Sequence, residues 1–148
     1  MKCVQSYVYV IVLLCMLPIK HGHAESMGQN ECDSLTIAAA SLMSNRSKTA
    51  SKESLLNALP SLEQPPYKMN SAKYLMLREM HTMVHEVFEH EAINPSVYMV
   101  FKGETCSKTM QGEPAPSYAD AYPKLKVCTE LPDNNEMIEC SIRAAESD

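Results

Sequence analysis

A long helical segment at residues 70–91 places the strongest constraint on the fold of this chain. With Asn70 as the predicted cap and a helical period of about 100° per residue, its apolar side chains cover about half of the circumference. These side chains are Tyr74, Met76, Leu77, Met80, Met83, Val84, Val87 and Phe88. A surface helix usually shows a narrower apolar stripe, somewhat wider than about 100°. The segment is therefore predicted to be a central helix against which several other elements pack.

Residues 1–24 are predicted to be a secretory signal peptide. Lys2 precedes an apolar run from Val8 to Ile19, and Gly22 and Ala24 are small residues at the positions that a signal peptidase reads. The run is shorter than the about 20 apolar residues of a membrane span, and it contains Pro18. No second stretch approaches membrane length. The mature chain is therefore expected to be soluble, secreted and extracellular.

Residues 25–148 are predicted to form one domain, which is long enough to bury a hydrophobic core. Cleavage would remove two of the 13 basic residues and none of the 18 acidic ones, which leaves a formal charge of 11 − 18 = −7. An acidic domain without a basic cluster binds nucleic acid poorly. We therefore expect no nucleic-acid partner, and no membrane partner for the mature form.

Four cysteines remain after cleavage: Cys32, Cys106, Cys128 and Cys140. An even number in a secreted chain implies two disulfides, for which three pairings exist. The short separation of Cys128 and Cys140 makes a bond between them feasible, and Cys32 would then pair with Cys106. An antiparallel arrangement, with the start of the first helix near the end of the central one, supports this pairing. No C-x-x-C pair is present, so a zinc ribbon or a thioredoxin-type site has no support.

Two helices are expected before the central one. The first is predicted to start at Asp33 or Ser34 and to stop at Ser44, because apolar residues recur at helical spacing between them. The second is predicted to start at Ser51 and to end at Pro60.

The segment after the central helix is less regular. Asn94 and Pro95 supply a cap and a first-turn proline, which favours a helix there. Residues 118–122 read as a helical turn, and residues 124–131 fit either a strand or a short helix. Asp133 and Glu136 resemble a capping box and predict a last helix.

The predicted fold is therefore mainly α, a small disulfide-stabilised domain of four or five helices. The alternative is an α+β fold with a short C-terminal hairpin, in which residues 125–131 pair with residues 137–142.

Histidines on the central segment are the candidates for a metal site. His81, His85 and Glu89 follow one another at four-residue spacing, which places them along one side of a helix. The spacing of a helical metalloprotease motif is missing, because His90 follows His85 by five residues rather than four. The simpler interpretation is a solvated polar edge, so we expect no metal and no cofactor.

Catalytic patterns are also missing. No serine lies in a G-x-S-x-G turn, and the four glycines form no phosphate-binding loop. We therefore expect a protein that is not an enzyme.

The first predicted function is binding or inhibition of an extracellular partner protein, with Tyr118 and Tyr122 as exposed contact residues.

The alternative function is a carrier for a small apolar ligand. The ligand face would be the apolar face of the central helix, because methionine side chains can line adaptable pockets as well as fill cores. The same face would then be only partly covered by the chain itself.

Asn45 begins an N-glycosylation sequon, Asn45-Arg46-Ser47, which needs an exposed position.

Overall fold

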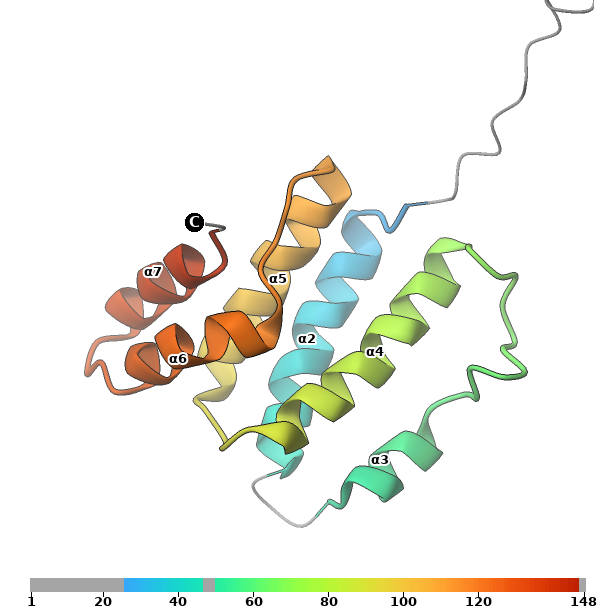
Figure 1. The fold of residues 1–148 in the computed structure, drawn as a ribbon, viewed down its shortest axis with the longest axis horizontal. Helices are drawn as coiled ribbons and strands as arrows, with labels where there is room; N and C mark the ends of the chain where they lie inside the picture. The colour runs from blue at the N-terminus through green and yellow to red at the C-terminus, as the bar shows by residue number, and fades with distance from the viewer. Residues whose placement is uncertain (1–25, 47–49, 147–148) are drawn as a thin grey trace, which may run out of the picture.

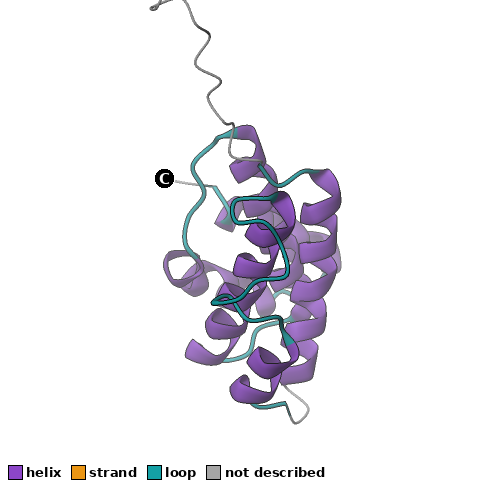
Figure 2. Ribbon diagram, turned by 90° about the vertical axis from the view of Figure 1, so that its right-hand side faces the viewer, coloured by secondary structure: helices purple, strands orange, loops and turns teal. Residues whose placement is uncertain are grey.

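The computed structural model describes residues 26–46 and 50–146, and this part of the chain is helical, with no strand (Figures 1 and 2). The mainly helical prediction is confirmed, and the alternative with a C-terminal hairpin is wrong. The described residues form six helices instead of the predicted four or five. They are α2 (Gln29–Arg46), α3 (Lys52–Ala58), α4 (Ala72–Glu89), α5 (Pro95–Gln111), α6 (Tyr118–Thr129) and α7 (Asn134–Ala144). The predicted signal peptide lies outside the described residues.

Helix α2 lies between α4 and α5 and packs against both (Figure 1). It buries Leu35, Ala39 and Met43, and the neighbouring helices contribute large core side chains such as Met83 and Phe101. The predicted start at Asp33 or Ser34 is wrong, since the helix begins at Gln29. This earlier start places Cys32 in the first turn of α2.

The other three helices, α3, α6 and α7, pack against α4 and α5. Helices α6 and α7 pack on each other and on α5, whereas α3 packs on α4 (Figure 1). The second predicted helix is confirmed, with Ser51 as its cap and an end at Ala58, before Pro60. The buried core draws its side chains from α2, α4, α5, α6 and α7.

The ends of the helices follow from capping side chains. Asn94 accepts from the backbone N–H of Ser96 and precedes Pro95, as the sequence predicts for α5. Asp133 caps α7 by accepting from two backbone N–H groups. The predicted cap of the central helix is wrong by one residue. Ser71 caps α4, and Asn70 adopts a left-handed backbone with φ of 65°.

Helix α6 contains residues 124–129 of the segment for which the sequence predicts either a strand or a short helix. It continues through Pro123, which has no N–H to donate to the preceding turn. One face nevertheless buries Tyr118, Ala121, Leu125 and Cys128. Burial of that face, together with a disulfide to α7, holds the segment helical despite the proline.

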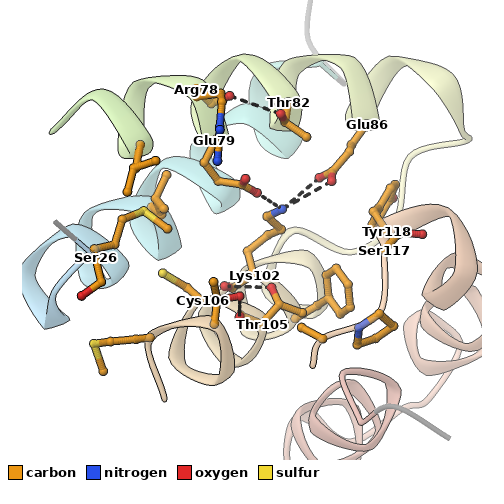
Figure 3. Close-up of a pocket in the computed structure, with 18 residues that line it drawn as sticks. Ser26, Arg78, Glu79, Thr82, Glu86, Lys102, Thr105, Cys106, Ser117 and Tyr118 are labelled. Carbon is orange, nitrogen blue, oxygen red and sulfur yellow. Dashed lines mark hydrogen bonds and ion pairs between the residues drawn. The ribbon is translucent and has the colours of Figure 1, made fainter. Parts of the chain in front are cut away.

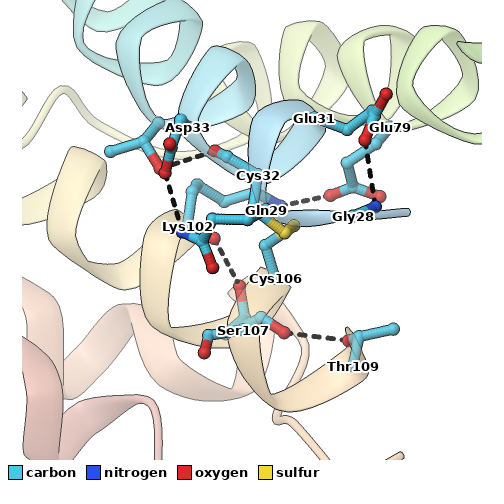
Figure 4. The surroundings of a disulfide bond; sticks show 12 residues. Gly28, Gln29, Glu31, Cys32, Asp33, Glu79, Lys102, Cys106, Ser107 and Thr109 are labelled. Carbon is cyan, nitrogen blue, oxygen red and sulfur yellow. Dashed lines mark hydrogen bonds and ion pairs between the residues drawn. A yellow bond between two sulfur atoms is a disulfide. The ribbon is translucent and has the colours of Figure 1, made fainter. Parts of the chain in front are cut away.

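Two disulfides connect helices, and both have the predicted pairing. Cys32–Cys106 joins α2 to α5 with a Cα–Cα distance of 5.6 Å (Figure 4). Cys128–Cys140 joins α6 to α7 with a Cα–Cα distance of 5.5 Å. The predicted reason for the first bond needs correction. The start of α2 lies beside the second half of α5, not beside the end of the central helix.

Candidate functional site: a pocket beside the central helix

The apolar face of α4 is part of the protein interior. Leu77, Met83, Val84 and Val87 are buried. The remaining predicted ligand-face residues are partly buried: Tyr74, Met76, Met80 and Phe88. Helices α2 and α3 both pack against α4. The structure contains a pocket beside a different side of α4, and none of these eight residues lines it.

That pocket has a volume of about 450 Å³ and lies between α4, α5, the start of the described chain and the segment 112–117 (Figure 3). Its size is within the about 300–1,000 Å³ range of small-molecule sites. Its apolar walls include Met27, Leu35, Leu75, Phe101 and Met110. Its polar walls include Arg78, Glu79, Thr82, Glu86, Lys102, Thr105 and Thr109.

A buried lysine lies in the wall of this pocket. The side chain of Lys102 is 7% exposed, and its Nζ lies 2.5 Å from Oε1 of Glu79 and 3.2 Å from Oε2 of Glu86. Figure 3 shows the lysine reaching from α5 toward both carboxylates on α4. A buried ammonium needs such partners, because desolvation of an unpaired charge is costly. One ammonium is therefore shared by two carboxylates.

Tyr98 extends this cluster into the core. Its hydroxyl donates to Oε2 of Glu86 at 2.7 Å, and the side chain is fully buried. Burial raises the pKa of Tyr98 far above its ordinary value of 10, and the adjacent Glu86 raises it further. The phenol therefore stays protonated and acts as a fixed donor to the carboxylate.

Helix periodicity explains how these side chains meet. Glu79 and Glu86 are seven residues apart on α4, so both point from the same side of the helix. Tyr98 and Lys102 are four residues apart on α5 and also share a side. Sequence reasoning missed this cluster. The seven-residue spacing of the carboxylates was its only local signal, and the pairing with α5 depends on tertiary packing.

No family model, curated protein or solved structure matches the chain. None of the helices in residues 26–46 and 50–146 has both the length and the apolar character needed to cross a membrane. The pocket and its charged cluster are therefore the features from which a function can be proposed.

The predicted exposure of Tyr118 is wrong. Its side chain is 3% exposed, and its ring lies 5.1 Å from that of Tyr98 and 6.0 Å from that of Phe101, centroid to centroid. Burial raises the pKa of Tyr118 above its ordinary value of 10. Tyr122 is half-buried and stacks on His90 at 4.4 Å. The flanking prolines suggested an exposed loop, but both tyrosines lie on α6, and Tyr118 belongs to its buried face.

The predicted polar edge of α4 carries two different histidine environments. Nε2 of His81 lies 2.9 Å from the carbonyl oxygen of Pro60, whereas His85 is exposed. Within the described ranges, no group of three or more His, Cys, Asp or Glu residues could hold a metal ion.

The predicted glycosylation residue Asn45 is exposed in the last turn of α2. The predicted end of that helix at Ser44 is therefore early by two residues. Ser47, the third residue of the sequon, lies outside the described residues. Glycan attachment at Asn45 stays a prediction.

Proposed function

We propose that this chain is a secreted, non-enzymatic binding protein that holds a small, partly apolar molecule in the pocket beside α4. The observation that carries the proposal is the cavity of about 450 Å³ with apolar walls and a few polar groups. Such a combination is typical of small-molecule sites, in which apolar surface supplies affinity and placed polar groups orient the ligand. The proposal keeps the predicted carrier function but moves its site away from the Met-lined face of α4.

The construction of the walls supports binding without catalysis. Cys106 lines the pocket, but its sulfur is already bonded to Cys32. Lys102 is held between Glu79 and Glu86, so its Nζ is paired with two carboxylates instead of free to act as a nucleophile. Both groups therefore shape the pocket.

A titration with a neutral fluorescent probe, N-phenyl-1-naphthylamine, tests the proposal. The wild-type chain is expected to bind it with the fluorescence increase of an apolar site. Ala115 lies in the pocket wall and is half-buried, so Ala115→Trp should fill part of the cavity. We expect it to weaken probe binding about tenfold or more, about 1.4 kcal/mol.

Ala119→Trp is the matched control for this experiment. Ala119 is exposed in the first turn of α6 and does not line the pocket, so probe binding should not change. Absent binding, or equal binding by both variants, would contradict the proposal. The prediction of an extracellular partner protein would then become the better hypothesis.

A further inference from the structure

We infer that the ligand of this pocket carries a basic amine, which Glu79 and Glu86 hold while the rest of the molecule lies against the apolar walls. The inference rests on the proposed function and adds the chemical class of the ligand. It is carried by the net negative charge of the cluster of Glu79, Glu86 and Lys102, and by the hydrogen-bond acceptors of these two carboxylates that have no partner.

The first observation is the charge of the cluster. Two carboxylates share the single ammonium of Lys102, so these three side chains carry a net formal charge of −1. The side chains of Glu79 and Glu86 are 31% and 15% exposed, so water screens this charge only partly. One added cation would bring the cluster to two carboxylates and two cations, without any change of the protein.

The second observation is that the threonine and lysine donors on the α4 and α5 walls are already used, whereas the buried hydroxyl of Tyr118 has no partner among the described residues and can donate or accept. The hydroxyls of Thr82, Thr105 and Thr109 donate to carbonyl oxygens of their own helices at 3.2, 3.3 and 2.8 Å. Lys102 donates to both carboxylates, at 2.5 Å to Glu79 and at 3.2 and 3.4 Å to Glu86. These residues therefore offer a ligand acceptors instead of donors.

The free acceptors lie on the carboxylates. Oε1 of Glu79 accepts from Lys102, while Oε2 of the same residue accepts no hydrogen bond from the described residues. Oε1 of Glu86 accepts only the long contact of 3.4 Å. A protonated amine has several N–H donors and a positive charge, so it satisfies both the free acceptors and the charge.

Arg78 is the remaining donor among the polar walls on α4 and α5, and it is exposed. An anionic ligand could reach its guanidinium, but it would then face the two carboxylates that already surround Lys102. Solvent weakens the attraction of an exposed cation more than the repulsion of the partly buried carboxylates. The geometry therefore favours a cation over an anion.

Three probes with the same chain and different head groups test the inference: octylamine, octanol and octanoate. Isothermal titration calorimetry at pH 7 gives the dissociation constant of each, with octylamine protonated and octanoate ionised. We expect octylamine to bind about tenfold more tightly than octanol, because a hydrogen bond to a charged group contributes at least that much. Octanoate should bind most weakly.

A pair of isosteric variants locates the amine. Glu79→Gln removes the charge but keeps the shape, so octylamine binding should weaken about tenfold while octanol binding stays the same. Glu89→Gln is the control, because Glu89 is exposed on the same helix and does not line the pocket. Thermal unfolding of both variants verifies that the fold is retained.

The outcomes separate this inference from the proposed function. Equal binding of the three probes, preference for octanoate, or an unchanged octylamine affinity in Glu79→Gln would overturn the amine while leaving a pocket binder. Failure of N-phenyl-1-naphthylamine to bind, or its indifference to Ala115→Trp, would overturn the pocket itself.

Discussion

At the scale of single residues, Lys102 shows how a charge can be buried on a helix that otherwise packs into the core. Its Nζ lies between the carboxylates of Glu79 and Glu86, and the hydroxyl of Tyr98 donates a hydrogen bond to Glu86. A cluster of this kind adds little stability compared with apolar side chains of the same size. Loss of one member is costly, because the others remain buried without their partner.

The first prediction follows from that asymmetry. Lys102→Met keeps the length of the side chain but leaves Glu79 and Glu86 facing each other without a cation. We expect the free energy of unfolding to fall by about 3 kcal/mol. Urea denaturation at pH 7, followed by circular dichroism, measures the change.

Lys126→Met is the matched control. Lys126 pairs with Glu91 at 2.5 Å, but both side chains are largely exposed. The hydrogen bond from Lys126 lowers the pKa of Glu91 below its ordinary value of 4.5. Exposed pairs contribute little to stability, so this variant should unfold almost like the wild type. Similar losses in the two variants would contradict the cost assigned to leaving Glu79 and Glu86 without their cation.

At the scale of elements, the end of α5 determines one wall of the pocket. Gly112 ends the helix with a left-handed backbone, φ of 75°, and its N–H donates to the carbonyl oxygen of Thr109. The chain then turns into the segment that contributes Ala115, Pro116 and Ser117 to the pocket. The position of this wall therefore depends on a backbone conformation that glycine adopts without strain.

The second prediction concerns this turn. Gly112→Ala should lower the free energy of unfolding by about 1 kcal/mol, because a Cβ disfavours the left-handed conformation. No atom lies within 4 Å of the added Cβ, so a clash does not contribute. Gly112→Asn should lose less, since asparagine tolerates this conformation. Thermal denaturation of the two variants tests the order, and a larger loss with asparagine would contradict it.

The elements also show which parts of the fold local sequence determines. The starts of α3, α5 and α7 are visible in the chain, because Ser51, Asn94 and Asp133 act through neighbouring backbone groups. The second half of α6 stays open between strand and helix because residues 124–131 alternate like a strand, and only tertiary burial decides for the helix that runs through Pro123. The charged cluster of the pocket could not be predicted, since Lys102 is 16 and 23 residues away from its partners.

At the scale of the whole molecule, the two disulfides restrict the chain to different extents. Cys32–Cys106 spans 74 residues and closes a loop that contains α3 and α4. Cys128–Cys140 spans 12 residues within one helical pair. Because the entropy of the unfolded chain falls with the logarithm of loop length, the longer loop should provide more stability.

The third prediction compares these bonds. The double variant Cys32→Ala, Cys106→Ala should lose about 4 kcal/mol of unfolding free energy, and Cys128→Ala, Cys140→Ala about 3 kcal/mol. Urea denaturation of both variants under oxidising conditions measures the difference. The opposite order would show that native contacts around the bonds, and not loop closure, dominate their effect.

The position of Cys106 has a practical consequence for how the protein is handled. Its disulfide ties the first turn of α2 to α5, and the same residue forms part of the pocket wall (Figures 3 and 4). Reduction would therefore loosen the wall as well as the fold. A preparation made in a reducing cytosol, or assayed with a thiol reductant in the buffer, would report on an altered cavity. Ligands should therefore be sought with protein that has been produced through an oxidising secretory route.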